Sequence, residues 1–164
     1  MIKLIVLDVD GCMTDGGIIY SNSAEETKKF NVKDGFAIVN WRKLGGELAI
    51  ITGRKSKIVE NRAAELGIKY LFQNVKDKKA TLVKLLEDIN ISADEVAAIG
   101  DDLNDYNLLS YVGKSFTPND GVEKVKEIVD CVLTRKGGDA AVREMIEIVL
   151  EENGQLEQFM ELWI

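Results

Sequence analysis

Residues 2–15 read Ile-Lys-Leu-Ile-Val-Leu-Asp-Val-Asp-Gly-Cys-Met-Thr-Asp, and this stretch decides the fold. Residues 2–8 form an apolar, β-prone run that stops at the carboxylate of Asp8, as a strand buried on both faces would. A second carboxylate, that of Asp10, follows two residues later. In an open parallel sheet, ligands bind beyond the carboxyl ends of the strands. The stretch therefore predicts a central strand that delivers two acidic side chains to that edge, although two turn residues are the alternative.

The rest of the chain alternates between short apolar runs and longer helical patterns. We expect further strands over 47–52, 69–72, 95–99, 114–117 and 130–133. We expect helices over 34–44, 55–66, 77–90, 102–110, 120–129 and 138–152. Strands that alternate with helices of about ten residues or more describe repeated βα units, hence a parallel sheet with helices on both faces. The sequence thus predicts one α/β domain over residues 1–164, with a three-layer α/β/α, Rossmann-like architecture.

Two segments depart from this alternation. Residues 17–32 contain two β-prone stretches around a Ser-Asn-Ser turn, which predicts a β-hairpin projecting from the end of the first strand. A plain surface loop is the alternative. The tail over residues 155–164 is unusually apolar for a terminus expected to fray. We expect this tail to dock on its own domain or on a neighbouring subunit.

The composition excludes several classes of protein. None of the 164 residues is histidine, which excludes Ser-His-Asp triads and histidine-ligated zinc sites. A net charge of -7 argues against nucleic-acid binding, which needs a basic face. No apolar run approaches the ~20 residues that span a bilayer, and no secretory signal is readable, so we expect a cytoplasmic protein without a membrane segment. Cys12 and Cys131 form no CxxC pair and are expected to stay reduced.

Polar groups follow three further strands of the expected sheet. Thr52 and Gly53 precede an expected helix, whose N-terminus can help to hold a phosphate; alternatively, Thr52 only caps that helix. Lys78 opens the next helix, where a cation is unfavourable unless an anion pairs with it; a solvated charge cluster is the alternative. Three carboxylates within five residues follow the strand at 95–99: Asp101, Asp102 and Asp105. They would repel one another without a cation, and a hard divalent ion is the natural occupant.

The order of these motifs, Asp-x-Asp, Thr, Lys and then Asp-Asp, resembles that of the haloacid dehalogenase-like phosphotransferases. Within that superfamily the chain is most similar to the 3-deoxy-D-manno-octulosonate 8-phosphate (KDO 8-phosphate) phosphatase family, over nearly its full length. The matching stretches are residues 8–16, 30–35, 51–55, 99–102, 137–138 and 141–144. Cys12 and Met13 stand where that family more often has aliphatic residues.

The resemblance implies a Mg²⁺-dependent phosphatase that acts through an aspartyl-phosphate, in the synthesis of a lipopolysaccharide precursor. Asp8 would be the nucleophile, and Asp10 the general acid and base. Mg²⁺ would be held by Asp8, Asp101 and the backbone carbonyl of Asp10. Support for the phosphoryl oxygens and the metal site would come from Thr52, Gly53, Lys78, Asp102 and Asp105.

The resemblance also implies a small-molecule substrate, a sugar acid phosphate. The positions that the family uses around its sugar acid match Asn31, Val32, Lys33, Asp34, Gly35, Arg54 and Arg62. An arginine fork suits the carboxylate of a 2-keto sugar acid. Two alternatives stay open here: Arg62 forms only surface ion pairs, and Asp34 is only the N-cap of the following helix.

The length leaves no room for an inserted cap domain beyond the hairpin at 17–32. The family that the chain resembles is capless and tetrameric, so we expect a homotetramer with this hairpin at the interface and the tail near an adjacent site. Two rival hypotheses are a catalytically idle binding module and a phosphoacceptor receiver domain. The intact motif residues argue against the first, and the late position of the double-acid cluster argues against the second. A nine-carbon sugar acid phosphate would present the same groups as the eight-carbon one.

Overall fold

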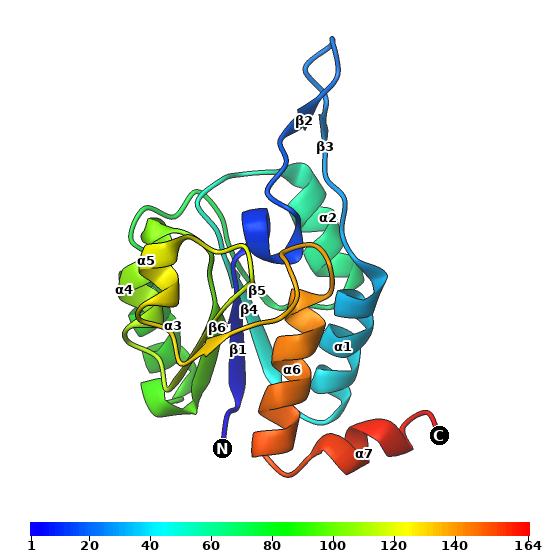
Figure 1. Ribbon diagram of the computed structural model, residues 1–164, viewed down its shortest axis with the longest axis vertical. Helices are drawn as coiled ribbons and strands as arrows, with labels where there is room; N and C mark the ends of the chain where they lie inside the picture. The colour runs from blue at the N-terminus through cyan, green and yellow to red at the C-terminus, as the bar shows by residue number, and fades with distance from the viewer.

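Six strands form a parallel sheet in the order β5-β4-β1-β6-β7-β8 in the computed structural model, which describes residues 1–164 (Figure 1). The strands are β1 (Leu4–Leu7), β4 (Glu47–Ile51), β5 (Tyr70–Phe72), β6 (Val96–Ile99), β7 (Lys114–Thr117) and β8 (Cys131–Val132). The predicted parallel sheet is confirmed, with strand ends shifted by two residues or fewer. The chain adds β4 and β5 on one side of β1 and the later strands on the other, so the carboxyl end of β1 is a switch point where ligands bind in such sheets.

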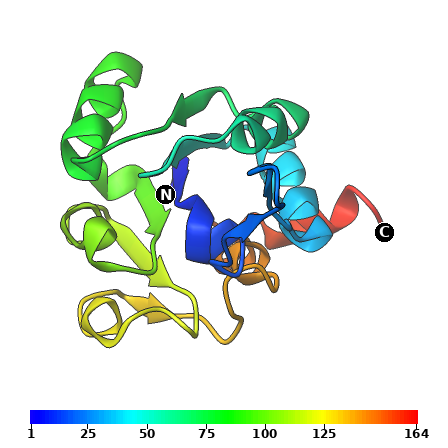
Figure 2. The same ribbon diagram turned by 90° about the horizontal axis from the view of Figure 1, so that it is seen from above.

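Helices cover both faces of the sheet, as the views in Figures 1 and 2 show. One face carries α1 (Val32–Lys43), α2 (Lys57–Glu65) and α6 (Ala141–Glu152), and the other carries α3 (Lys78–Ile89), α4 (Tyr106–Leu109) and α5 (Glu123–Lys126). None of the helices has the length and apolar character needed to cross a membrane.

The side chains of β1 divide between the two cores. Ile5 and Leu7 belong to the cluster that contains the α1, α2 and α6 side chains, whereas Leu4 and Val6 belong to the opposite cluster. Successive side chains of a strand point to opposite faces, and all four are at most 2% exposed. The uninterrupted apolar run at the N-terminus is therefore explained by burial on both sides.

Two helices are shorter than predicted on the α3 face. The expected helix over 102–110 divides into a 3₁₀ turn, Leu103–Asp105, and the short α4. The reason lies in its start, where Asp102 and Asp105 form a capping box that favours a separate tight turn. The expected helix over 120–129 contracts to the single turn of α5.

The start of α6 also differs from the predicted helix over 138–152. Gly138 and Ala140 have φ angles of +73° and +69°, which belong to the left-handed region. Residues in this conformation do not continue a right-handed helix. The helix therefore begins at Ala141, and the segment before it remains an irregular loop.

The predicted hairpin is present and projects away from the sheet (Figure 1). Its strands, β2 (Ile19–Tyr20) and β3 (Glu26–Thr27), pair antiparallel. The tail forms α7 (Leu156–Glu161) at the opposite end of the molecule (Figure 1). Phe159 is buried, and the Trp163 indole N–H donates to Asn40 Oδ1 of α1 at 3.2 Å. The tail therefore docks on its own domain, which is one of the two possibilities expected from the sequence.

Candidate active site

The carboxylate of Asp8 lies at the carboxyl end of β1 and is almost completely buried. Lys78, the first residue of α3, donates from Nζ to Asp8 Oδ1 at 2.7 Å and to Asp105 Oδ1 at 2.5 Å. Asp105 Oδ2 accepts the backbone N–H of Asp101 at 3.1 Å. Lys78 is 2% exposed, so the solvated-cluster alternative does not hold for it. The ammonium is tolerated at a helix N-terminus because two carboxylates surround it.

Two carboxyl groups of this site, those of Asp8 and Asp101, have raised pKa values. Burial raises the pKa of Asp8 to about 7, and the neighbouring Asp105 carboxylate contributes to the rise. Burial likewise raises the pKa of Asp101 to about 7, with help from Asp105 and Asp102. Burial by itself would lower the pKa of Lys78, but Asp8 and Asp105 outweigh it and raise the pKa above its ordinary value. Several carboxylates therefore share a single ammonium, and an additional cation would stabilise their ionised forms.

The donor atoms near Asp8 fit a hard divalent cation. Oxygens of Asp8 and Asp101 lie within 4.8 Å of each other and of the Cys12 sulfur. Burial raises the pKa of the Cys12 thiol well above its ordinary value, so Cys12 remains an uncharged S–H. Magnesium prefers oxygen ligands and keeps several waters, so two carboxylates and a backbone carbonyl are a sufficient protein contribution. The residues present therefore suit Mg²⁺, with Asp10 lining the same cavity.

Gly11 allows Asp101 to approach the turn that follows β1. Its φ angle is +96°, and a Cβ atom at this position would overlap the Asp101 carboxylate. Gly137 packs against the same turn, since a Cβ there would overlap the carbonyl of Gly11. The N–H of Gly138 donates to the Cys12 carbonyl at 3.0 Å. The pair at 137–138 therefore supports the loop that carries the acidic residues.

A cavity of about 150 Å³ opens beside these carboxylates. Its walls are formed by Asp8, Asp10, Thr52, Gly53, Arg54, Asp101, Asp102 and Asn104. All of these except Asn104 were expected from the sequence to belong to the site. Asn104 was missed, although its position between two acidic site residues at the end of β6 was a usable signal.

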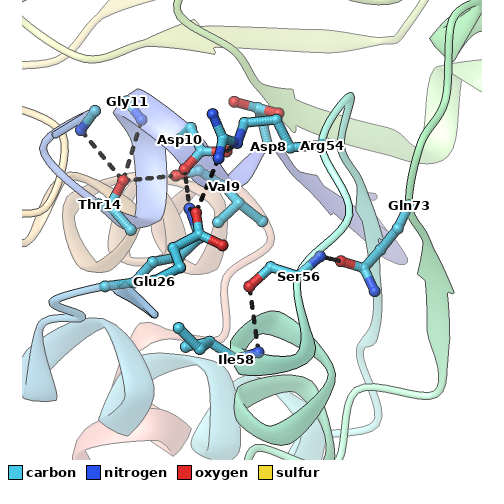
Figure 3. A network of polar contacts seen from close by, with 12 residues as sticks. Asp8, Val9, Asp10, Gly11, Thr14, Glu26, Arg54, Ser56, Ile58 and Gln73 are labelled. Carbon is cyan, nitrogen blue, oxygen red and sulfur yellow. Dashed lines mark hydrogen bonds and ion pairs between the residues drawn. The ribbon is translucent and has the colours of Figure 1, made fainter. Parts of the chain in front are cut away.

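The segment after β4 differs from its prediction. The helix expected over 55–66 begins at Lys57 and is capped by Ser56, whose Oγ accepts the Ile58 N–H at 3.2 Å (Figure 3). Thr52 therefore does not cap this helix, so that alternative is wrong, and the helix itself begins two residues later than expected. The physical reason is local: Gln73 Oε1 accepts the Ser56 N–H at 2.8 Å and holds the preceding segment as an irregular loop. Thr52 is 2% exposed and lines the cavity.

The base of the hairpin adds a polar network that the sequence analysis missed. Lys28 Nζ lies 2.5 Å from Asp10 Oδ1 and 3.2 Å from Glu26 Oε1. Arg54 donates from Nη2 to Glu26 Oε1 at 3.0 Å and to the Tyr20 hydroxyl at 3.1 Å. Figure 3 shows the side chains of Asp10, Glu26 and Arg54 converging. A strand-like alternation would place Glu26 and Lys28 on one face, but it gives no indication that Lys28 contacts Asp10.

The loop expected to bind the sugar acid does not line this cavity in the single chain. Asn31 Oδ1 accepts the Lys33 N–H at 2.9 Å and caps α1. The alternative of Asp34 as N-cap is therefore wrong. Asp34 is buried, its Oδ1 accepts the Arg143 N–H at 2.9 Å, and burial raises its pKa to about 6. Val32 is exposed and does not line the cavity.

Arg62 also lies outside the cavity wall. Its Nη1 donates to Glu65 Oε2 at 2.9 Å, and its guanidinium stacks over the Phe30 ring at 5.4 Å. A Cβ at Gly35 would overlap the same guanidinium, so α1 and α2 pack closely here. The ion pair proposed as the alternative for Arg62 is present. Of the two arginines expected at the substrate, only Arg54 lines the cavity within one chain.

Comparisons with known proteins give a consistent result. A family model for haloacid dehalogenase-like hydrolases matches residues 71–146. The 3-deoxy-D-manno-octulosonate 8-phosphate phosphatase of Escherichia coli K12 is 41% identical over 157 residues, which cover 96% of this chain and 84% of the relative. The same phosphatase from Moraxella catarrhalis, solved with a magnesium ion, a phosphate ion and KDO, superposes with a TM-score of 0.97 at 39% identity, covering 99% of this chain and 94% of that one. The cobalt-bound phosphatase from Haemophilus influenzae gives a TM-score of 0.92 at 36% identity, covering 96% and 92%.

Proposed function

This chain belongs to the haloacid dehalogenase-like hydrolases, within the KDO 8-phosphate phosphatase family, and on that premise we propose that it hydrolyses KDO 8-phosphate to KDO and inorganic phosphate. The observation that carries the proposal is the buried Asp8 carboxylate, held by Lys78 beside a small polar cavity. The reaction would serve the synthesis of a lipopolysaccharide precursor. The cytoplasmic location expected from the sequence stays a prediction.

Asp8 is the nucleophile of the proposed reaction. One of its oxygens attacks phosphorus while the ester bond to the sugar breaks, which leaves an aspartyl-phosphate on the enzyme. Lys78 fixes Oδ1 of Asp8 at 2.7 Å, so the carboxylate is held in one orientation before the substrate arrives. Water then attacks the aspartyl-phosphate and releases inorganic phosphate.

Asp10 exchanges protons with the leaving sugar and with the hydrolytic water. It lines the same cavity as Asp8, two positions further along the same loop, so a substrate bound in that cavity would lie next to both carboxylates. It gives a proton to the departing sugar oxygen in the first step and takes one from water in the second. This role needs no imidazole, which agrees with a chain that has no histidine.

Mg²⁺ is the proposed cofactor, held by the carboxylates of Asp8 and Asp101 and by the backbone carbonyl of Asp10. Bound there, the ion would supply electrostatic stabilisation of phosphoryl oxygens that gain charge. Asp102 lies in the cavity wall and can accept hydrogen bonds from metal-bound water. Asp105 accepts the Asp101 N–H and so holds the loop that carries the ligand.

Thr52, Gly53 and Lys78 complete the phosphate site. The first two line the cavity, and Lys78 brings the cation nearest to Asp8. Hydrogen-bond donors aimed at the phosphoryl oxygens stabilise the charge of the transition state.

The substrate carboxylate is assigned to Arg54, whose Nη2 is held by Glu26 and Tyr20 while the guanidinium lines the cavity. Arg62 and the loop at 31–35 would act on the substrate from a neighbouring subunit, because they do not line the cavity of their own chain.

A homotetramer would supply those residues. The hairpin exposes three large apolar side chains, those of Ile18, Ile19 and Tyr20, at 43%, 49% and 58%. Exposed apolar side chains do not stabilise an isolated hairpin, whereas a subunit interface would bury them. A monomer by light scattering that is also fully active in a phosphate-release assay would exclude this assembly.

The decisive experiment compares phosphate release from a panel of sugar phosphates with and without Mg²⁺. We expect the highest kcat/KM for KDO 8-phosphate and none for Asp8→Asn. Preferred turnover of a nine-carbon 2-keto-3-deoxy sugar acid phosphate would change the substrate but keep the chemistry. Preferred turnover of hexose phosphates, or an active Asp8→Asn, would contradict the proposal. The exposed Asp88→Asn serves as the matched control and should keep full activity.

A further inference from the structure

Lys28 is a buried cation to which the reaction as described gives no part. Its side chain is 1% exposed, although it belongs to a hairpin that otherwise projects into solvent. Two carboxylates neutralise it: Asp10 Oδ1 at 2.5 Å and Glu26 Oε1 at 3.2 Å. Burial of a charged ammonium is costly unless it is paired and hydrogen-bonded, so both contacts are needed to keep Lys28 in this position.

The contact with Lys28 distinguishes the two oxygens of Asp10. Oδ1 accepts from the Lys28 ammonium, whereas Oδ2 accepts no hydrogen bond and lies 3.9 Å from Arg54 Nε. A separation of 3.9 Å exceeds that of a hydrogen bond. Asp10 and Arg54 both line the cavity that contains Asp8. Oδ2 is therefore the oxygen of Asp10 left for a reacting group.

We propose that Lys28 is a positioning residue for Asp10: its ammonium, anchored by Glu26, holds Oδ1 and so presents Oδ2 to the leaving oxygen of the substrate. This inference rests on the proposed function. In the assisted step, an oxygen of Asp8 forms its bond to phosphorus and the phosphorus–oxygen ester bond breaks. The electron pair of that bond takes up the proton carried by Asp10 Oδ2, and the sugar leaves as an alcohol.

Glu26 extends the same anchor to the substrate side of the site. Its Oε1 also accepts from Arg54 Nη2 at 3.0 Å, so one hairpin carboxylate holds both Lys28 and Arg54. The general acid and the proposed carboxylate-binding arginine thus share one support. A displacement of a reacting group by about 1 Å can reduce a rate 10²-fold, so this support has a kinetic consequence.

The test compares esters whose leaving groups differ in their need for a proton. The sugar oxygen of KDO 8-phosphate must be protonated as it leaves, because it would otherwise depart as an unstable alkoxide. The leaving group of p-nitrophenyl phosphate is a stable phenolate that needs no proton. For Lys28→Met we expect kcat/KM for KDO 8-phosphate to fall by about 10- to 100-fold, a part of the 10²–10⁴ that general acid catalysis supplies. For p-nitrophenyl phosphate the fall in kcat/KM should be at least about tenfold smaller. KM for KDO 8-phosphate should change little, and Lys28→Arg should restore most of kcat.

Two controls separate positioning from a structural role. Lys29→Met removes the neighbouring exposed lysine and should leave both esters unaffected. Mg²⁺-dependent binding of orthovanadate requires no proton transfer, so Lys28→Met should bind it as the parent protein does. Equal losses for both esters, loss of vanadate binding, or no loss at all would each overturn the inference. An active Asp8→Asn would instead defeat the proposed function, whereas an inactive Asp8→Asn with an unselective Lys28→Met defeats the inference alone.

Discussion

Replacing Asp8 by asparagine should stabilise the metal-free protein at alkaline pH, although it removes the proposed nucleophile. In the folded protein, burial raises the pKa of Asp8 to about 7 from an ordinary value of 3.8. An unfolded chain releases this proton near pH 4, whereas the folded chain keeps it until near pH 7. The free energy of unfolding therefore decreases as pH rises between these two values.

The size of the effect follows from the shift. Each pKa unit corresponds to about 1.4 kcal/mol, so a shift of about three units gives about 4 kcal/mol at most. Between pH 4.5 and pH 8.5 the Asp8 contribution should lower the free energy of unfolding by about 3 kcal/mol. Asparagine has no proton to lose in this range, and its Oδ1 can still accept the hydrogen bond from Lys78.

Urea denaturation in the presence of EDTA measures this difference, with fluorescence of the buried Trp41 as the probe. Asp8→Asn and the parent should have similar stability near pH 4.5, and Asp8→Asn should be the more stable by about 3 kcal/mol at pH 8.5. Asp88→Asn, which changes an exposed carboxylate of α3, should follow the parent at both values. Added Mg²⁺ should stabilise the parent by about 2.7 kcal/mol at 100 times its Kd, and Asp8→Asn by less. If the free energy of unfolding changed with pH in the same way for the parent and for Asp8→Asn, the reasoning would be refuted.

Three further predictions follow from single contacts. Thr52→Ala should lower kcat by about 10²–10³ with little change in the free energy of unfolding, because it removes one donor to the phosphoryl group; steady-state kinetics and urea denaturation check both. Gly11→Ala should weaken Mg²⁺ binding, measured by calorimetry, because a Cβ there overlaps the Asp101 carboxylate; an unchanged Kd would contradict the assigned contact. Asp34→Asn should remove the part of the stability loss between pH 4 and 6 that comes from the raised pKa of Asp34, and thermal denaturation across that range would reveal it.

The stability of this protein and its chemistry make opposite demands on the same loop. Asp8 and Asp101 have raised pKa values because the fold buries them next to other carboxylates. Such crowding destabilises the metal-free chain, yet it concentrates negative charge that a divalent cation can neutralise. A site of this kind is therefore expected to be more stable with its cation than without it.

The sequence by itself was sufficient for the sheet and for most of the cavity wall. Apolar runs define the strands, and polar residues at their carboxyl ends must meet at one edge because parallel strands end on the same side. Asp8, Thr52 and Asp101 could therefore be grouped although they lie far apart in the chain. Helix boundaries were less accurate, since capping by Ser56 and the left-handed conformation of Ala140 depend on local hydrogen bonds and φ angles that propensity does not specify.

Only the tertiary structure decided which charged groups meet. The hairpin folds back so that Lys28 reaches Asp10, eighteen residues earlier, and no periodicity of the sequence encodes that approach. The tertiary structure also placed Arg62 against Phe30, and Asp34 against the start of α6, away from the cavity that contains Arg54. The physical reason is that strand and helix patterns report burial within one element, whereas a charge pair depends on the direction of two side chains from different elements.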